Sequence, residues 1–303
     1  MSGFDAQAIG PQTVTLTYTD AYGNQMTDST TVIVDLATIT GQATHPIAGP
    51  AATWDYRDSV TQVIDANGKT IDVDTADITA TTPDLTPAKA GKPQTVTLTY
   101  TDSLGKIHTT DVIVTTTLSK AKITAVADQI IWPDQAKQLT ATDLVDHLYD
   151  AEGHLITNHD NVKMSVLDSK LAGQQRLTLT YTDVAGNQSV AYANVTVDQA
   201  KLVTKPSTVI AGPTATWSYE AGISQLTNAA GQLITVQPGT IKVLNRPDLS
   251  VDSVGQQQLI TLIYTDELGK SQSVTAMVTA KASQATLTAK EAVILQPDAA
   301  GQS

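Results

Sequence analysis

Apolar and polar residues alternate strictly in four stretches of the chain, and each stretch ends in the tripeptide Tyr-Thr-Asp. In one of them Val96, Leu98 and Tyr100 take every second position, with threonines between them. A period of two places the apolar side chains on one face of a β-strand and the threonines on the other. The tyrosines of the four stretches are Tyr18, Tyr100, Tyr181 and Tyr264. We therefore predict four strands, each with one buried face.

A turn and a second alternating stretch follow each Tyr-Thr-Asp. In the same copy, Asp102 and Gly105 precede Val112 and Val114. Two alternating stretches joined by Asp-x-x-Gly are typical of a β-hairpin, because the Asp side chain accepts hydrogen bonds from turn amides and glycine adopts the positive φ that the turn needs. Further glycine turns at residues 66–69, 151–154 and 229–232 predict a second hairpin upstream in the unit.

The spacing of apolar residues changes just before these upstream turns. Val60, Val63 and Ile64 stand at positions i, i+3 and i+4, and Ile223 and Leu226 show the same step of three. This spacing favours a helix over a strand. We predict a single helical turn at these positions.

The chain is a tandem repeat. Successive Tyr-Thr-Asp tyrosines are 82, 81 and 83 residues apart, a period typical of arrays of small domains. Short connections without Gly/Ser or Pro-rich spacers predict a semi-stiff string. The predicted units are the C-terminal half of a repeat at 1–36, complete repeats at 37–119, 120–199 and 200–283, and the start of another at 284–303.

The repeats alternate between two types. The sequence from Ile47 to Trp54 returns from Ile210 to Trp217, displaced by 163 residues. Repeats 37–119 and 200–283 are therefore type A, whereas 120–199 and 284–303 are type B. Two repeat types could encode two complementary junction surfaces, although drift after the duplication of a two-repeat cassette explains the pattern equally well.

Composition narrows the class of protein. Among 303 residues, 41% are hydrophobic and 48 are threonine, which suits β-structure with thin cores and excludes membrane insertion of this segment. The net charge is −12 and no cysteine is present. A nucleic-acid partner is excluded because no basic stripe exists, and disulfides and thiolate metal sites are excluded by the lack of cysteine.

Several aspartates are candidate calcium ligands. The four that close Tyr-Thr-Asp are Asp20, Asp102, Asp183 and Asp266. Calcium binds clustered carboxylates, but we interpret these residues as turn caps. We interpret Asp72, Asp74 and Asp77 as a solvated strand end, because the stretch lacks the glycine and the distal glutamate of an EF-hand loop.

Histidines cluster in one place, where His147, His154 and His159 stand near Asp146, Asp150 and Asp160. Imidazole and carboxylate are ligands of zinc, but the other repeats have no matching histidines, and we predict loop side chains that face water. The motifs of hydrolases, nucleotide-binding proteins and metalloproteases are missing from the sequence. We predict no enzyme activity, no catalytic residue, no cofactor and no metal site.

Two further features have alternative interpretations. Lys122 and Asn194 are the residue types of a spontaneous isopeptide bond, but the sister repeats lack this pair. Trp54, Trp132 and Trp217 could be platforms that stack on sugars, yet large aromatic residues in a chain with so few are more often core or junction filler.

The Gly, the alternating strand, the Tyr-Thr-Asp-x-x-Gly turn and the Val-x-Val finish of each unit resemble the bacterial immunoglobulin-like repeats of Gram-positive surface adhesins, of the group 3 type. The resemblance implies an all-β fold of tandem Ig-like β-sandwich modules in an elongated array. Such modules build stalks, and some bind host glycans, mucus or matrix proteins.

From the resemblance and the residues together, we expect a non-enzymatic stalk of an exported bacterial adhesin, which holds a distal binding domain away from the cell wall. We expect a monomer outside the cell, attached to the wall through segments outside this chain, with neighbouring repeats as its main partners. One alternative is an adhesive module that recognises host glycoprotein or polysaccharide. Another is an accessory region of a secreted glycan-acting enzyme.

Overall fold

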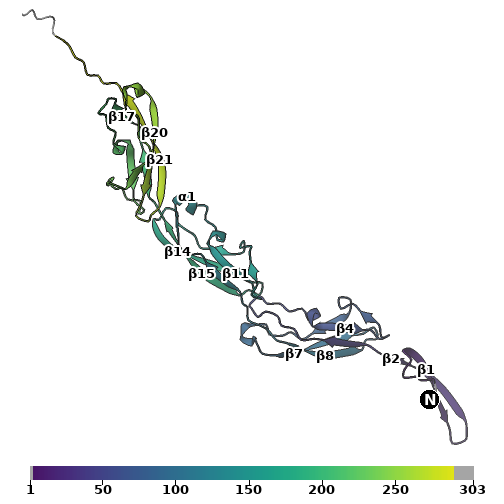
Figure 1. Ribbon diagram of the computed structural model, residues 1–303. Helices are drawn as coiled ribbons and strands as arrows, with labels where there is room; N and C mark the ends of the chain where they lie inside the picture. The colour runs from purple at the N-terminus through teal and green to yellow at the C-terminus, as the bar shows by residue number, and fades with distance from the viewer. Residues whose placement is uncertain (1–2, 290–303) are drawn as a thin grey trace, which may run out of the picture. The chain divides into compact units, whose positions relative to one another are not determined.

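The computed structural model describes residues 3–289 and confirms the all-β fold (Figure 1). The helical elements of this part of the chain are turns of three or four residues, among them α1 (Pro133–Ala136). None of these helices is long and apolar enough to cross a bilayer.

The chain divides into two compact units. Unit 1 holds residues up to 127, 140–166 and 176–193, and unit 2 holds 128–139, 167–175 and the chain from 194 onward. Most of the predicted segment 284–303 lies outside the described residues.

The first hairpin is formed by β1 (Gly10–Thr19) and β2 (Gln25–Val34), which pair antiparallel over their whole length. Val14 on β1 is buried, but Leu16 is 44% exposed and Tyr18 is 62% exposed. In the next repeat the corresponding Leu98 and Tyr100 are 0% and 3% exposed. The apolar face of this hairpin therefore lacks the cover that a second sheet gives to its counterpart.

The segment predicted as the first A repeat is a sandwich of two sheets. One sheet has the order β3-β4-β5 and the other β6-β7-β8. Their inward side chains form one core, in which Val63, Leu98 and Val114 are fully buried. The strands are β3 (Thr38–Gly41), β4 (Val60–Ile64), β5 (Thr70–Ile71), β6 (Asp77–Ala80), β7 (Gln94–Thr101) and β8 (Ile107–Val114), with 3-10 turns η1 (Tyr56–Ser59) and η2 (Pro87–Lys89).

The segment predicted as the B repeat has the same strand plan. One sheet has the order β12-β11-β9, while the other has the order β10-β15-β14-β13. The strands are β9 (Lys122–Ala125), β10 (Gln129–Ile131), β11 (Val145–Tyr149), β12 (Leu155–Ile156), β13 (Lys163–Met164), β14 (Gly173–Thr182) and β15 (Gln188–Val197), and η3 (Thr142–Leu144) precedes β11.

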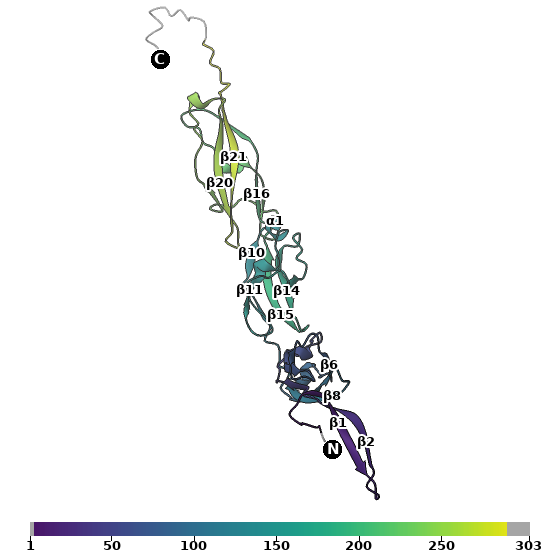
Figure 2. The same ribbon diagram turned by 90° about the vertical axis from the view of Figure 1, so that its right-hand side faces the viewer.

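The segment predicted as the second A repeat repeats the plan again, and β20 and β21 form its long hairpin (Figure 2). Ile260, Leu262 and Tyr264 on β20 are buried in its core. The strands are β16 (Lys201–Thr204), β17 (Ser207–Ile210), β18 (Ile223–Thr227), β19 (Ile241–Val243), β20 (Gln257–Thr265) and β21 (Ser271–Lys281), with 3-10 turns η4 (Tyr219–Gly222) and η5 (Val251–Ser253).

In each of these segments the first part of the chain changes sheets. β16 pairs antiparallel with β18 in one sheet, and β17 then pairs parallel with β21 in the other. In the B segment β10 pairs parallel with β15. In the first A segment the counterpart is reduced to two parallel bridges, Thr44 to Val114 and Ile47 to Thr117. The first and last parts of each segment are therefore joined directly by hydrogen bonds.

The predicted hairpins are confirmed, but the predicted helical turn is misplaced. Val60 and Val63 lie in strand β4, and the 3-10 turn η1 ends just before them. A register shift between Thr40 and Gly41 inserts an extra residue, Thr61, in the bulged strand. A bulge changes which face the following residue points to, so both valines are buried at a spacing of three. Register shifts at the start of β11 and β18 act in the same way.

Candidate functional site

The turn aspartates, which we define as Asp102, Asp183 and Asp266 of the described repeats, close the long hairpins. Asp102 Oδ1 accepts hydrogen bonds from the amides of Leu104 at 2.8 Å and Lys106 at 2.9 Å. Asp183 and Asp266 accept the corresponding pair of amides through the same oxygen. The turn-cap interpretation is confirmed. Because Oδ1 is occupied by the turn, Oδ2 of each carboxylate is left for another partner.

Beside these turns lie the connector residues, which we define as Asp35, Ser119 and Asp198. Each lies between the last strand of one repeat and the first strand of the next, and each caps the amide two residues ahead. Ser119 Oγ also donates to Oδ2 of Asp183 at 2.6 Å. Burial raises the pKa of Asp183, but the hydrogen bonds from Ser119 and Asn187 outweigh burial and lower it overall. The connector is thus tied to a hairpin turn about sixty residues further along the chain.

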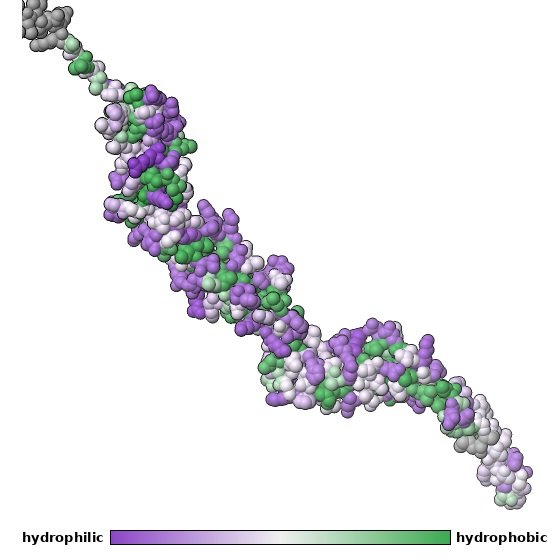
Figure 3. Space-filling view, in the orientation of Figure 1, coloured by the Kyte–Doolittle hydropathy of each residue, from purple (hydrophilic) through white to green (hydrophobic). Residues whose placement is uncertain are grey.

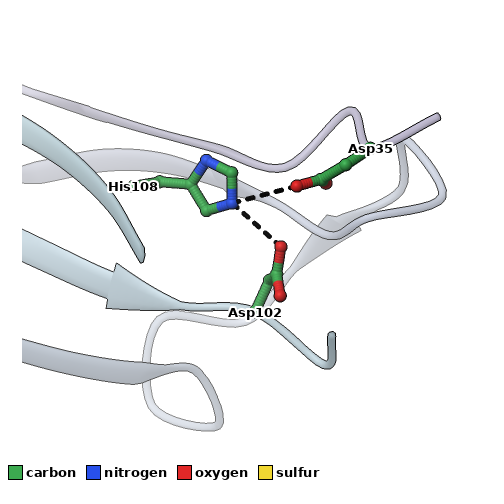
Figure 4. Close-up of side chains that lie close together, drawn as sticks. All are labelled: Asp35, Asp102 and His108. Atoms are coloured by element: carbon green, nitrogen blue, oxygen red, sulfur yellow. Dashed lines mark hydrogen bonds and ion pairs between the residues drawn. The ribbon is translucent and has the colours of Figure 1, made fainter. Parts of the chain in front are cut away.

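In the first A segment the connector and the turn aspartate meet at a histidine (Figure 4). His108 Nε2 lies 2.9 Å from Asp102 Oδ2 and 3.3 Å from Asp35 Oδ2. His108 stands on β8 opposite Tyr100 of the Tyr-Thr-Asp motif. Burial alone would raise the pKa of Asp102, but the hydrogen bonds from His108 and from the turn amides lower it to about 2.

In the second A segment the same two carboxylates meet without a histidine. Gln272 takes the place of His108 and hydrogen-bonds the backbone of Ala200 and Leu202 instead. Oδ2 of Asp198 and Oδ2 of Asp266 are buried, and no other group donates to them. Burial and the neighbouring carboxylate of Asp266 raise the pKa of Asp198 to about 6, against the attraction of Lys270. A buried pair of carboxyl groups therefore stands at this joint, where the first A segment has a histidine between two carboxylates.

A second contact at the joint between the first A and the B segments involves backbone. The amide of Ala51 donates to the carbonyl of Ala185 at 2.8 Å, and Asn187 Nδ2 donates to the carbonyl of Ala48 at 2.9 Å. Gly49 lies so close that a Cβ atom on it would be 2.1 Å from the Ala185 oxygen. The loop of the A segment is thus seated directly on the hairpin turn of the B segment.

The joint between the B segment and the second A segment uses different side chains. Lys270 Nζ donates to the carbonyl of Ile130 at 2.8 Å and lies 4.6 Å from the ring centre of Trp132. Lys270 and Asn187 hold the same position after the turn glycine. Both reach back to a carbonyl of the preceding segment, one as a cation over an aromatic ring and one as a neutral amide. The two kinds of joint therefore have distinct chemistry.

The tryptophans are core and junction filler, as predicted. Trp54 packs against the core of the first A segment and donates to Thr44 Oγ1 at 3.0 Å. Trp217 donates in the same way to Ser207 Oγ at 2.9 Å. Trp132 packs against the core of the second A segment, which places it at the joint.

The remaining candidate residues have separate partners. His147 pairs with Asp146 at 2.7 Å and His154 with Asp150 at 3.2 Å, while His159 contacts the carbonyl of Ile156. Asn194 donates its amide to Asp128, and Lys122 is exposed at the start of β9. Asp72, Asp74 and Asp77 are exposed, as the interpretation of a solvated strand end predicts.

Neither a protein family nor a curated protein matches this chain. Among solved structures, it resembles a tetra-tandem repeat in the extending region of a large adhesion protein, with 14% identity and a TM-score of 0.26, over 90% of this chain and 82% of that one. It also resembles Drosophila N-cadherin EC1-4, with 13% identity and a TM-score of 0.20, over 89% and 83%. Likeness at this level adds nothing to the assignment of function.

Proposed function

We propose that this chain is a structural spacer of an exported bacterial surface adhesin, built to hold a distal binding domain away from the cell wall. The observation that carries the proposal is that each connector residue lies against the long hairpin of the following repeat, and that Ser119 is hydrogen-bonded to the turn of that hairpin. A spacer needs joints that resist bending, since free linkers of a few residues would let the modules collapse on one another.

The alternation of A and B repeats fits this proposal. The described A-to-B joint uses Gly49 against Ala185 with Asn187 as donor, whereas the B-to-A joint uses Lys270 over Trp132. An A repeat placed after another A repeat would lose both sets of contacts. This difference favours complementary junction surfaces over drift as the reason for the alternation.

Small-angle scattering of the full chain tests the spacer. A compact protein of this length has a radius of gyration of about 19 Å. Three sandwiches end to end, each with strands of about 30 Å, would give about 30 Å or more. A value near that of a compact protein would contradict the proposal.

A second candidate function is binding of host glycoprotein or polysaccharide. An open depression of about 790 Å³ in the second A segment is lined by Trp217, Tyr219 and Arg246, a mixture that suits sugar recognition. Gly212 and Pro213 at its rim correspond to Gly49 and Pro50, the loop that contacts the next repeat in the first A segment. Hydrophobic and hydrophilic residues are interspersed on the face shown in Figure 3.

A glycan array and a mucin pull-down with the full chain separate the two functions. The spacer predicts no saturable binding. Saturable binding that is lost in Arg246→Ala, but kept in a variant of the exposed Arg176 on β14, would establish the binding module instead.

A further inference from the structure

We propose that Asp35, Asp102 and His108 form a binding site for a divalent transition metal, with zinc as the best fit. The three side chains come from the connector, the hairpin turn and strand β8, so a bound ion would clamp the first hairpin to the first A segment (Figure 4). The proposal adds a ligand to the joint and does not depend on the spacer function. It also departs from the expectation of a chain without a metal site.

The geometry is close to that of a zinc site before any ion enters. Ligand atoms in a tetrahedral zinc site lie about 3.3 Å apart, because each is about 2.0 Å from the metal. The distances from His108 Nε2 to Asp35 Oδ2 and Asp102 Oδ2 are 3.3 and 2.9 Å. The three ligand atoms all lie within 4.8 Å of one another. The His108 to Asp102 edge needs to lengthen by only about 0.4 Å to match that spacing.

Both carboxylates are oriented for the metal by the backbone. Oδ1 of Asp102 is held by the amides of Leu104 and Lys106, and Oδ1 of Asp35 is held by the amide of Ala37. The Oδ2 atoms are thereby directed at His108 Nε2. Hydrogen bonds that fix the second atom of a ligating group are typical of metal sites, because they orient the ligand.

Charge and access favour a cation as well. The Asp102 side chain is fully buried and the Asp35 side chain is nearly so, whereas the His108 side chain is 22% exposed and leaves a route from solvent. A single imidazole faces two carboxyl groups, a donor set that suits a divalent cation. Zinc would neutralise both carboxylates, and an imidazole ligand selects it over calcium, which prefers an all-oxygen site.

The other joints supply internal controls. Where Ser119 meets Asp183, both the second carboxylate and the histidine are missing. Where Asp198 lies beside Asp266, the histidine is replaced by Gln272. The substitution His108→Gln therefore installs a residue that the sister repeat already accepts. Asp35→Asn keeps an oxygen to cap Ala37 while it removes the negative charge.

Titration calorimetry of the full chain with zinc chloride tests the proposal. We expect one site, with affinity reduced at least ten-fold in His108→Gln and in Asp35→Asn, and unchanged in His147→Gln, which alters an exposed His-Asp pair elsewhere. Cobalt should give the visible spectrum of a tetrahedral complex, and this spectrum should disappear in the same two variants. Circular dichroism without metal shows that each variant folds. Equal zinc affinity in all four proteins, loss of binding only in His147→Gln, or tighter binding of calcium than of zinc would overturn the site.

Discussion

Gly49→Ala is expected to open the joint between the first A segment and the B segment. A Cβ atom at this position would lie 2.1 Å from the carbonyl oxygen of Ala185, so the loop and the turn must separate. Their separation breaks the hydrogen bond from Ala51 to Ala185 and the one from Asn187 to Ala48. Overpacking of this kind costs about 1–3 kcal/mol, and each lost hydrogen bond adds about 1 kcal/mol.

Hydrogen exchange measures this effect at the joint itself. The amide of Ala51 should lose its protection, while amides in the core strands β7 and β20 keep theirs. Gly212→Ala is the matched control, since Gly212 occupies the same position in the second A segment and a Cβ atom there meets nothing within 4 Å. Equal protection of Ala51 in the wild type and in Gly49→Ala would refute the contact.

Asp198→Asn is expected to stabilise the second A segment at pH 7.5. The pKa of Asp198 is raised to about 6 in the folded chain, compared with about 3.9 in an unfolded one. A group with a raised pKa contributes stability below its unfolded pKa, and this contribution is lost as the pH rises through the folded value. Near pH 7.5 Asp198 is therefore charged in a buried position beside Asp266, and this destabilises the folded chain.

The amide of asparagine resembles the protonated carboxyl group. Its oxygen can still accept from the amide of Ala200, and its NH₂ group can donate to Asp266. Urea unfolding, followed by hydrogen exchange in β20 and β21, should show Asp198→Asn to be more stable than the wild type at pH 7.5 and nearly equal to it at pH 4.5. A difference that is the same at both pH values would contradict the raised pKa of Asp198.

Asp35→Asn is expected to destabilise the first A segment, which is the opposite of the effect expected for Asp198→Asn. The pKa of Asp102 is lowered to about 2 in the folded chain, compared with about 3.9 in an unfolded one. The contacts of Asp102 therefore stabilise the fold above about pH 3.9, and this stabilisation is lost as the pH falls through the folded pKa. Removal of the Asp35 charge takes one partner from His108. In buffer with chelator, this variant should therefore be less stable than the wild type at pH 6.

Local pattern was sufficient to predict the strands and turns that depend on neighbours in sequence. The alternation at Val96, Leu98 and Tyr100 identified a strand and its buried face, and Asp102 with Gly105 identified the turn. The local pattern gave the wrong element at Val60 and Val63, because a bulge in the strand produces the spacing of a helix. Periodicity alone cannot separate these two cases, because each buries residues three apart.

The joint residues depend on contacts between distant parts of the chain, which no local pattern reports. Ser119 and Asp183 are 64 positions apart and meet only because the fold returns the hairpin turn to the connector. One signal was present in the sequence: the connector position is Asp before each A repeat, at Asp35 and Asp198, and Ser before each B repeat, at Ser119 and Ser283. The role of this connector position can be recognised only in the folded chain, where it lies beside the turn aspartate.

The parallel pairing of β17 with β21 has a mechanical consequence. These two strands carry the entering and the leaving chain of the same segment, and they are hydrogen-bonded from Ser207 to Ile210. Tension applied at the two ends would pull β17 and β21 in opposite directions along their length. The bonds between them would then be loaded together in shear rather than broken one by one, so the second A segment is arranged to resist unfolding under tension.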